Sequence, residues 1–188
     1  MKQLLLLFTL FFMVSCEDKK SPEKKDLKTE LQTMSEKFKQ NQIDLQLNAT
    51  PKYFSAKTIS GKQFNSEDYK GKNLVILVYD NSYLKKSDTY DLSEEFNKIY
   101  NSYKDKVQFI GIIEGFTDSE AELQKSVKES KILFDQIDNT ISTNQEEKII
   151  HNISCDPAKI VIDQSGKVIL SSCGGKNSSD LISILEKL

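Results

Sequence analysis

The residues that could carry chemistry in this chain of 188 residues are few: three cysteines and a single histidine. Cys155 and Cys173 are the two thiols near the C-terminus, and thiols in an oxidising compartment can pair. Three readings of them stay open: separate buried thiols, a structural disulfide, or a functional redox pair. A redox pair needs an activated thiolate, and neither residue has a helix N-terminus or a cation evident beside it in sequence.

The histidine, His151, forms a His-x-x-x-Cys pattern with Cys155, and such a pattern can indicate a metal site. A structural metal site, however, usually needs about four ligands. We favour the alternative, a polar residue at the end of a helix. We therefore predict no metal and no cofactor.

The third cysteine, Cys16, stands at the end of an apolar N-terminal stretch. Residues 1–3 form a short basic start, residues 4–13 are apolar apart from one threonine, and small residues precede the cysteine. Such a stretch makes about 15 Å of helix, half of what a bilayer core needs. The last four residues resemble the lipobox of bacterial lipoproteins. This resemblance implies that residues 1–15 are a signal peptide, and that lipids on Cys16 hold the domain on a membrane outside the cytoplasm. The alternative is an ordinary secretory signal followed by an unmodified cysteine.

The composition argues against nucleic acid as a partner. The chain has 26 basic and 28 acidic residues, and every basic residue is lysine. Without arginine there is no bidentate fork for phosphate, and no basic patch with interleaved aromatic residues occurs.

The region between the cysteine and the globular part predicts a tether and a helix, over residues 16–47. Residues 17–25 are charged and contain one proline, which is typical of a solvated linker. Leu27, Leu31, Met34 and Phe38 then recur with the spacing of one helical face. We expect this face to pack on the domain that follows.

From residue 48 onwards the pattern predicts a mixed α/β domain that ends at residue 188. Continuous apolar runs indicate buried strands, and spaced apolar residues indicate helices. Ser178 or Ser179 is placed to cap the last helix. The expected elements are a hairpin over 53–64, strands at 74–79, 107–113, 160–162 and 168–170, and helices at 92–103, 119–129, 142–152 and 181–188.

This order of elements resembles the thioredoxin fold, and short motifs sharpen the match to its envelope-anchored TlpA-type and redoxin branch, which is related to alkyl hydroperoxide reductase and thiol-specific antioxidant proteins. The resemblance implies a thioredoxin-like sandwich with a mixed central sheet flanked by helices. It also implies a cis-proline at Pro157, beside which Asp156 would border a groove that holds an extended segment of another protein. The motifs are Pro51–Phe54, Gly61–Lys62, Asp68–Lys72, Val107–Ile113, and Asp156–Ala158 followed by Ile160–Gly166.

The sequence departs from the family where its redox chemistry lies. The family places Cys-x-x-Cys after the central strand, whereas here Leu84 and Ser87 occupy those positions and the loop has no cysteine. Ser87 reads as a helix N-cap rather than a nucleophile. Asp80, Asn81 and Ser82 follow the strand directly, so they form either a recognition loop or a simple polar loop.

Our leading expectation is therefore a lipoprotein whose thioredoxin-like domain has lost its redox pair and binds an envelope protein or peptide, or serves a structural role. The alternative is a thiol–disulfide oxidoreductase that uses Cys155 and Cys173. If the last hairpin pairs Asp163 with Lys167, Pro157 lies opposite Cys173. Cys155 is then a diagonal neighbour at about 7–8 Å, slightly long for a disulfide.

Overall fold

The computed structural model describes residues 27–140 and 147–188. The expected signal peptide (1–15), Cys16 and the tether (17–25) lie outside the described residues. The chain divides into two compact units, one that ends at Lys37 and one that runs from Phe38 to Leu188. Within the described ranges, no helix has the length and apolar character needed to cross a membrane.

The expected amphipathic helix forms as α1 (Leu27–Asn41), and its Leu31 is 58% exposed. The residues that follow it belong to the second unit. Ile43 and Leu45 are 5% and 0% exposed, so they are core residues although they precede the expected domain start at residue 48. The globular unit therefore takes in part of the segment that we assigned to the tether and helix.

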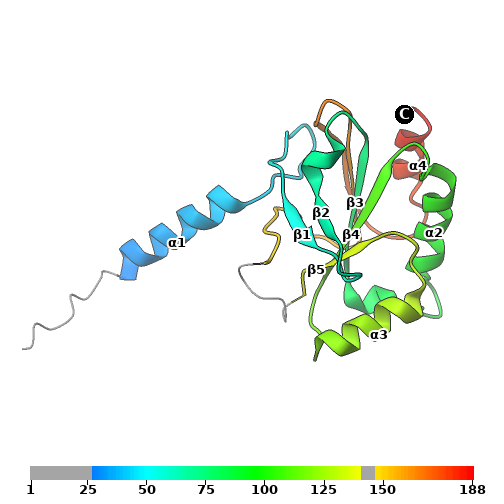
Figure 1. Cartoon of the computed structure of the whole chain (residues 1–188), viewed down its shortest axis with the longest axis horizontal. Coiled ribbons are helices and arrows are strands. Elements are labelled where there is room, and N and C mark those ends of the chain that lie inside the picture. Colours follow the sequence, from blue (N-terminus) through cyan, green and yellow to red (C-terminus); the bar gives the residue numbers. More distant parts are fainter. Residues whose placement is uncertain (1–26, 141–146) are drawn as a thin grey trace, which may run out of the picture. The chain divides into compact units, whose positions relative to one another are not determined.

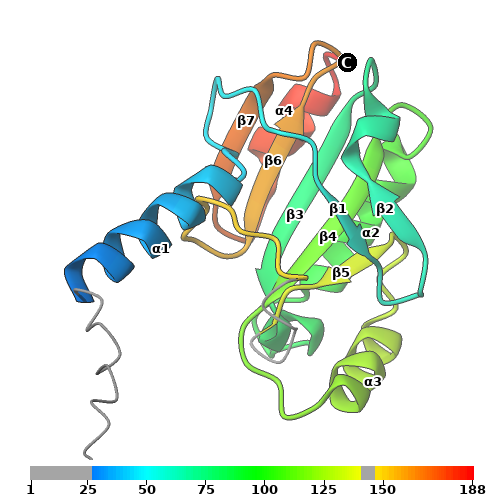
Figure 2. The same cartoon turned by 60° about the vertical axis from the view of Figure 1, so that its left-hand side comes forward.

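A mixed five-stranded sheet forms the centre of the second unit, with the order β5-β4-β3-β6-β7 that Figure 2 shows. β3, β4 and β5 run parallel, whereas β6 pairs antiparallel with both β3 and β7. The predicted central strands were correct, because β3 and β4 are buried along most of their length. The strands are β3 (Leu74–Asp80), β4 (Gln108–Glu114), β5 (Gln136–Asp138), β6 (Ala158–Ile162) and β7 (Val168–Cys173).

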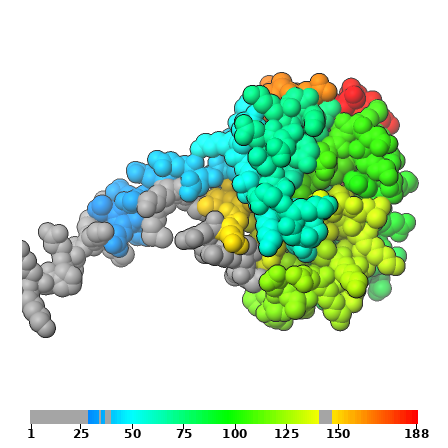
Figure 3. All heavy atoms as spheres, viewed as in Figure 1, coloured from blue at the N-terminus to red at the C-terminus, as the bar shows by residue number. Residues whose placement is uncertain are grey.

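Each face of the sheet has its own apolar core. One face packs under the helices α2 (Leu92–Tyr103), α3 (Glu120–Ser130) and α4 (Ser179–Leu185), with Phe96 and Phe109 among its fully buried side chains. The other face packs under the predicted hairpin, β1 (Ser55–Lys57) and β2 (Gln63–Asn65), which lies across the sheet in Figure 1 and covers the middle of the view in Figure 3. This is the α/β sandwich that the sequence predicted.

The close packing of β4 on its neighbours explains the glycine in that strand. A Cβ atom at Gly111 would lie 2.7 Å from the Tyr79 hydroxyl oxygen. That hydroxyl donates a buried hydrogen bond of 2.7 Å to Gln136 Oε1, which joins β3 to β5 across β4. Any larger residue at position 111 would displace this bond.

The register of the last hairpin differs from the expected one at its far end. Ile162 pairs with Val168, as the turn between Asp163 and Lys167 predicts. A β-bulge between Val161 and Ile162 then shifts the pairing by one residue, so that Ala158, and not Pro157, lies opposite Cys173. Bulges insert one unpaired residue, and apolar patterning does not reveal them.

Two predicted helical features near the C-terminus are wrong. Residues 147–152 form a turn, irregular chain and a bridge between His151 and Ile43 instead of a helix, while residues 142–146 of the predicted helix lie outside the described residues. Ser178 precedes α4, but its side chain makes no capping bond because its hydroxyl donates to the Glu95 carboxylate.

Candidate disulfide site

Cys155 and Cys173 form a disulfide, with 5.9 Å between their Cα atoms. Cys173 is the last residue of β7 and is exposed, whereas Cys155 is half-buried and packs on the core beneath the hairpin. The reading of two separate thiols is thereby wrong. The separation is shorter than the expected diagonal because Cys155 lies in the irregular chain before β6 rather than in a regular strand.

The predicted cis-proline lies two residues beyond Cys155. The peptide bond between Asp156 and Pro157 is cis, and Pro157 is buried. The Pro157 carbonyl accepts a hydrogen bond of 2.8 Å from the Gly174 amide. This bond continues the pairing of β6 and β7 beyond the strands, so the chain on both sides of the disulfide is fixed.

Carboxylates from three segments approach each other at this edge of the sheet. Partial loss of solvent around the mostly exposed Asp156 carboxyl raises its pKa, and the negative charges of Asp80 and Glu114 raise it further. Asp80 ends β3 and Glu114 ends β4, so the carboxyl ends of two parallel strands face the segment that carries the cis-proline. The neighbourhood of the disulfide is therefore acidic.

The possible recognition loop is a short 3₁₀ helix, η2 (Asn81–Leu84). The Asp80 carboxylate caps it by accepting a 2.9 Å hydrogen bond from the Ser82 amide. The Asn81 side chain donates to the Phe116 carbonyl, which ties the loop to the chain after β4. Phe116 is itself 67% exposed, so an apolar ring lies at the surface beside the loop.

The two positions equivalent to the family's thiols are separated by structure. Leu84 is 4% exposed within the core that the helices cover, and η2 ends there. Ser87 is exposed in the following loop, where its hydroxyl donates to the Tyr90 carbonyl at 3.1 Å. The prediction that Ser87 caps a helix is wrong, since α2 starts at Leu92 and is capped by Asp91.

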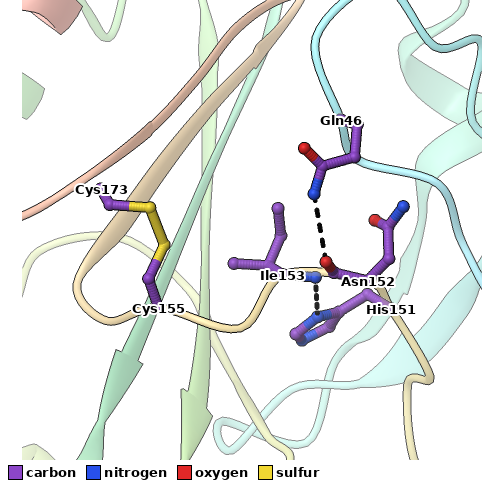
Figure 4. Close-up of a disulfide and its surroundings, with 6 residues drawn as sticks. All are labelled: Gln46, His151, Asn152, Ile153, Cys155 and Cys173. Carbon is purple, nitrogen blue, oxygen red and sulfur yellow. Dashed lines mark hydrogen bonds between the residues drawn. A yellow bond between two sulfur atoms is a disulfide. The ribbon is translucent and has the colours of Figure 1, made fainter.

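His151 is a buried residue of the site rather than a polar residue at a helix end. Its side chain is 3% exposed, and its Nε2 lies 3.0 Å from Glu114 Oε1. Its other ring nitrogen, Nδ1, accepts a 3.3 Å hydrogen bond from the Ile153 amide (Figure 4). Burial alone would raise the pKa of Glu114, but the contact with His151, a hydrogen bond from Asn139 and the charge of Lys148 hold that pKa below its usual range.

The segment from His151 to Cys155 is also held by the chain that follows α1. The Ile43 amide donates to the Ile150 carbonyl at 2.7 Å, and the Leu45 amide donates to Asn152 Oδ1 at 2.9 Å. Gln46 donates to the Asn152 carbonyl at 3.2 Å, a bond that Figure 4 shows above the imidazole. Residues from both ends of the chain thus position the cysteine-bearing segment.

Sequence reasoning missed Glu114 and Asn139 as members of this site. Asn139 accepts from the Ile149 amide at 2.8 Å and donates to both the Ile149 carbonyl and Glu114 Oε1 at 3.1 Å. The available signal was a charged residue directly after a buried apolar strand. In the described ranges, no three His, Cys, Asp or Glu side chains are grouped as metal ligands.

Comparisons with known proteins identify the fold. No sequence profile of a known family matches the chain, and no curated protein is significantly similar to it. Many solved structures do match, and three illustrate the range: a DsbF homologue from Corynebacterium diphtheriae, a putative thiol-disulfide oxidoreductase domain from Bacteroides thetaiotaomicron, and an exposed lipoprotein thioredoxin from Streptococcus pneumoniae.

The first of these is 20% identical, with a TM-score of 0.58 over 75% of this chain and 87% of the other. The second is 18% identical, with a TM-score of 0.57 over 77% and 99% of the two chains. The third is 18% identical, with a TM-score of 0.56 over 73% and 100%. At such identities the likeness establishes the fold, which is thioredoxin-like.

Our leading expectation of a domain without a redox pair, serving only as a protein-binding or structural component, is wrong. The chain does hold a joined cysteine pair, and one of the solved structures that it resembles, from Bacteroides thetaiotaomicron, is described as a domain of a putative thiol-disulfide oxidoreductase. The sequence argument placed the Cys155–Cys173 pair second because the family's motif is missing from the loop after the central strand and because no helix N-terminus or cation is evident beside either cysteine in sequence.

Proposed function

We propose that this thioredoxin-like domain is a thiol–disulfide oxidoreductase of the bacterial envelope whose redox pair is Cys155 and Cys173. One observation carries the proposal: the disulfide joins an exposed cysteine to a half-buried one, directly beside the cis peptide bond of Pro157. An exposed sulfur is accessible to an incoming thiolate, whereas a buried structural disulfide is not.

The difference in exposure assigns the two sulfurs different roles. A thiolate of a dithiol substrate attacks Cys173 Sγ, the bond between the two cysteines breaks, and Cys155 leaves as a thiolate that takes up a proton. The second thiolate of the substrate then attacks the substrate sulfur that is bonded to Cys173. A disulfide forms within the substrate, and Cys173 is released as a thiolate. Two electrons pass from the substrate to the protein, and the same steps run in reverse when reduced protein meets a substrate disulfide.

The same edge of the fold offers a place for the substrate chain. β7 is an edge strand of the sheet and ends at Cys173, and the backbone around Pro157 lies next to it. An extended segment can bind such an edge through backbone hydrogen bonds, with its thiol placed at the disulfide. The partner class is therefore an envelope protein that presents a cysteine in an extended segment.

The lipoprotein reading of the N-terminus belongs to the same proposal. Disulfides persist outside the cytoplasm, and export with lipidation at Cys16 would place the domain there, on a membrane. One solved protein of this fold, from Streptococcus pneumoniae, is described as an exposed lipoprotein. Replacement of Cys16 by serine should abolish labelling by fatty acid and release the protein from the detergent phase, and full retention in that phase would contradict the anchor.

The function is tested with the full chain, insulin as the disulfide substrate and dithiothreitol as the electron donor. We expect insulin reduction above background for the wild-type protein and its loss in Cys173→Ser. Cys155→Ser should instead accumulate a mixed disulfide through Cys173, because the thiol that resolves it is missing. Mass spectrometry of the trapped species identifies the sulfur that was attacked.

Two results would overturn the proposal. One is a wild-type rate at background while the Cys155–Cys173 bond is fully reduced by the donor, which would make the bond a structural cross-link only. The other is an equal rate in Cys173→Ser. Thermal melting of the reduced wild-type protein serves as the reference for both serine variants, since it also lacks the cross-link.

A further inference from the structure

The buried His151 and the half-buried Glu114 have no role in the exchange steps described above, although His151 lies four residues before Cys155 in the chain. An imidazole that is 3% exposed lies 3.0 Å from a carboxylate, and the two come from segments far apart in sequence. Burial of an ionisable ring is costly unless the ring has polar partners, and Glu114 is the acidic partner at this one. Apolar packing alone therefore does not explain why these two side chains lie together.

The imidazole lies between Glu114 and the backbone that leads to Cys155. The Ile153 amide donates to Nδ1, so Nδ1 carries no proton and the proton of the neutral ring is on Nε2, facing Glu114. Glu114 is held in turn by Asn139, which also fixes both backbone groups of Ile149. A chain of polar contacts thus connects the ends of β4 and β5 to the backbone two residues before Cys155.

We propose that His151, held by Glu114, positions the backbone that carries Cys155, and so keeps its sulfur within reach of Cys173 when the pair is reduced. This role rests on the function proposed above. In the reduced protein nothing covalent joins the two cysteines, so the probability that they meet depends on how strongly the 151–155 segment is restrained. His151 is a positioning residue here, since it does not touch either sulfur.

Other charged groups surround this pair and do not substitute for it. Lys148 lowers the pKa of Glu114 through its charge, whereas Asp80 and Asp156 lie on the side of the cis-proline. Asp44 binds the neighbouring Asn152 side chain at 2.7 Å and makes no bond to the imidazole. Only the ring of His151 joins Glu114 to the Ile153 amide among the described contacts.

The decisive measurement is the equilibrium of the Cys155–Cys173 pair with glutathione, in the full chain. Two glutathione molecules reduce the bond to two thiols and leave as oxidised glutathione, and the fractions are read by alkylation and mass spectrometry. His151→Phe keeps a flat ring but removes both nitrogens. We expect the pair to become about five- to tenfold easier to reduce, a potential about 20 to 30 mV less negative.

Two further variants separate positioning from general stability. Glu114→Ala keeps the imidazole but removes its anchor, and should shift the equilibrium in the same direction; it also serves if His151→Phe does not fold. Glu114→Gln keeps an oxygen that can accept from Nε2 and should stay within about twofold of wild type. Asn97→Ala is the matched control, because Asn97 bonds the Lys131 carbonyl and Leu133 amide at 2.9 Å on α2, away from the disulfide.

The inference is overturned if His151→Phe and Glu114→Ala melt at lower temperature, as Asn97→Ala should, yet leave the glutathione equilibrium unchanged. The outcomes for this inference and for the proposed function are distinguishable. A shifted equilibrium with no insulin reduction by wild type removes the enzymatic function and with it the role in exchange. An active wild type with an unshifted equilibrium removes the role of His151 alone.

Discussion

The loop after β3 and the segment before β6 lie at the same edge of the sheet, but they are built differently. In the loop, Leu84 is packed into the core and Ser87 is exposed in irregular chain. In the segment, Cys155 and Cys173 are joined beside a cis-proline and supported by buried polar bonds. The comparison teaches that the edge of this fold, rather than one loop, is where a sulfur pair can be presented.

The largest expected effect comes from moving the pair into the loop. A variant with Leu84→Cys and Ser87→Cys, and with Cys155 and Cys173 replaced by serine, should lose insulin reduction by at least about 100-fold. The reason is that η2 ends at Leu84 and α2 starts only at Leu92, so no helical turn brings positions 84 and 87 together. Recovery of the wild-type rate by the transplanted pair would break the comparison.

The second effect concerns stability and distinguishes the two loop positions. Leu84→Ala should lower the free energy of unfolding by about 2–5 kcal/mol, because it removes a core side chain that is 4% exposed. Ser87→Ala should cost less than about 1 kcal/mol, since its bonds to Tyr90 are at the surface. Denaturant unfolding of both variants measures the difference, and equal losses would mean that Leu84 is not part of the core.

The smallest effect concerns the acidic surroundings of the disulfide. The pKa of Asp156 is raised in the folded protein, so the folded state binds more protons there than the unfolded chain and is destabilised at neutral pH. Asp156→Asn should therefore stabilise the protein at neutral pH, by no more than about 0.5 kcal/mol because the carboxyl is exposed and screened. The gain should vanish below the ordinary aspartate value of 3.8. A gain that persists there would have another cause.

Much of the fold was predictable from the sequence because its elements have strong local signals. The continuous apolar runs of β3 and β4 are seven residues long, which suits a buried strand and is short for a helix. The spaced apolar residues of α2 match one helical face. Short elements gave weaker signals. β5 has only three residues, and its stability comes from pairing with β4 and from the Tyr79 bond to Gln136, neither of which is visible locally.

Part of the candidate site was predictable, since the sequence indicates the cis-proline and both cysteines. The residues that support the cysteine-bearing segment were not predictable. Glu114 and His151 are 37 residues apart and meet because Asn139 holds the backbone of Ile149 beside the end of β4. The disulfide itself depended on the bulge, and Ser87 was misread because the family's helix start was assumed to be retained.

The bulge in the last hairpin makes the placement of Cys173 a question of parity. Paired residues point to the same side of a sheet, and successive residues alternate. Val168 and Ala158 both belong to the core beneath the hairpin β1–β2, on which Cys155 also packs. Cys173 lies an odd number of residues after Val168, so in a strand paired without a bulge it would point to the helical side. The unpaired residue between them turns it back, so the same sequence paired in regular register from Val168 onward would part the two sulfurs without a change in either cysteine.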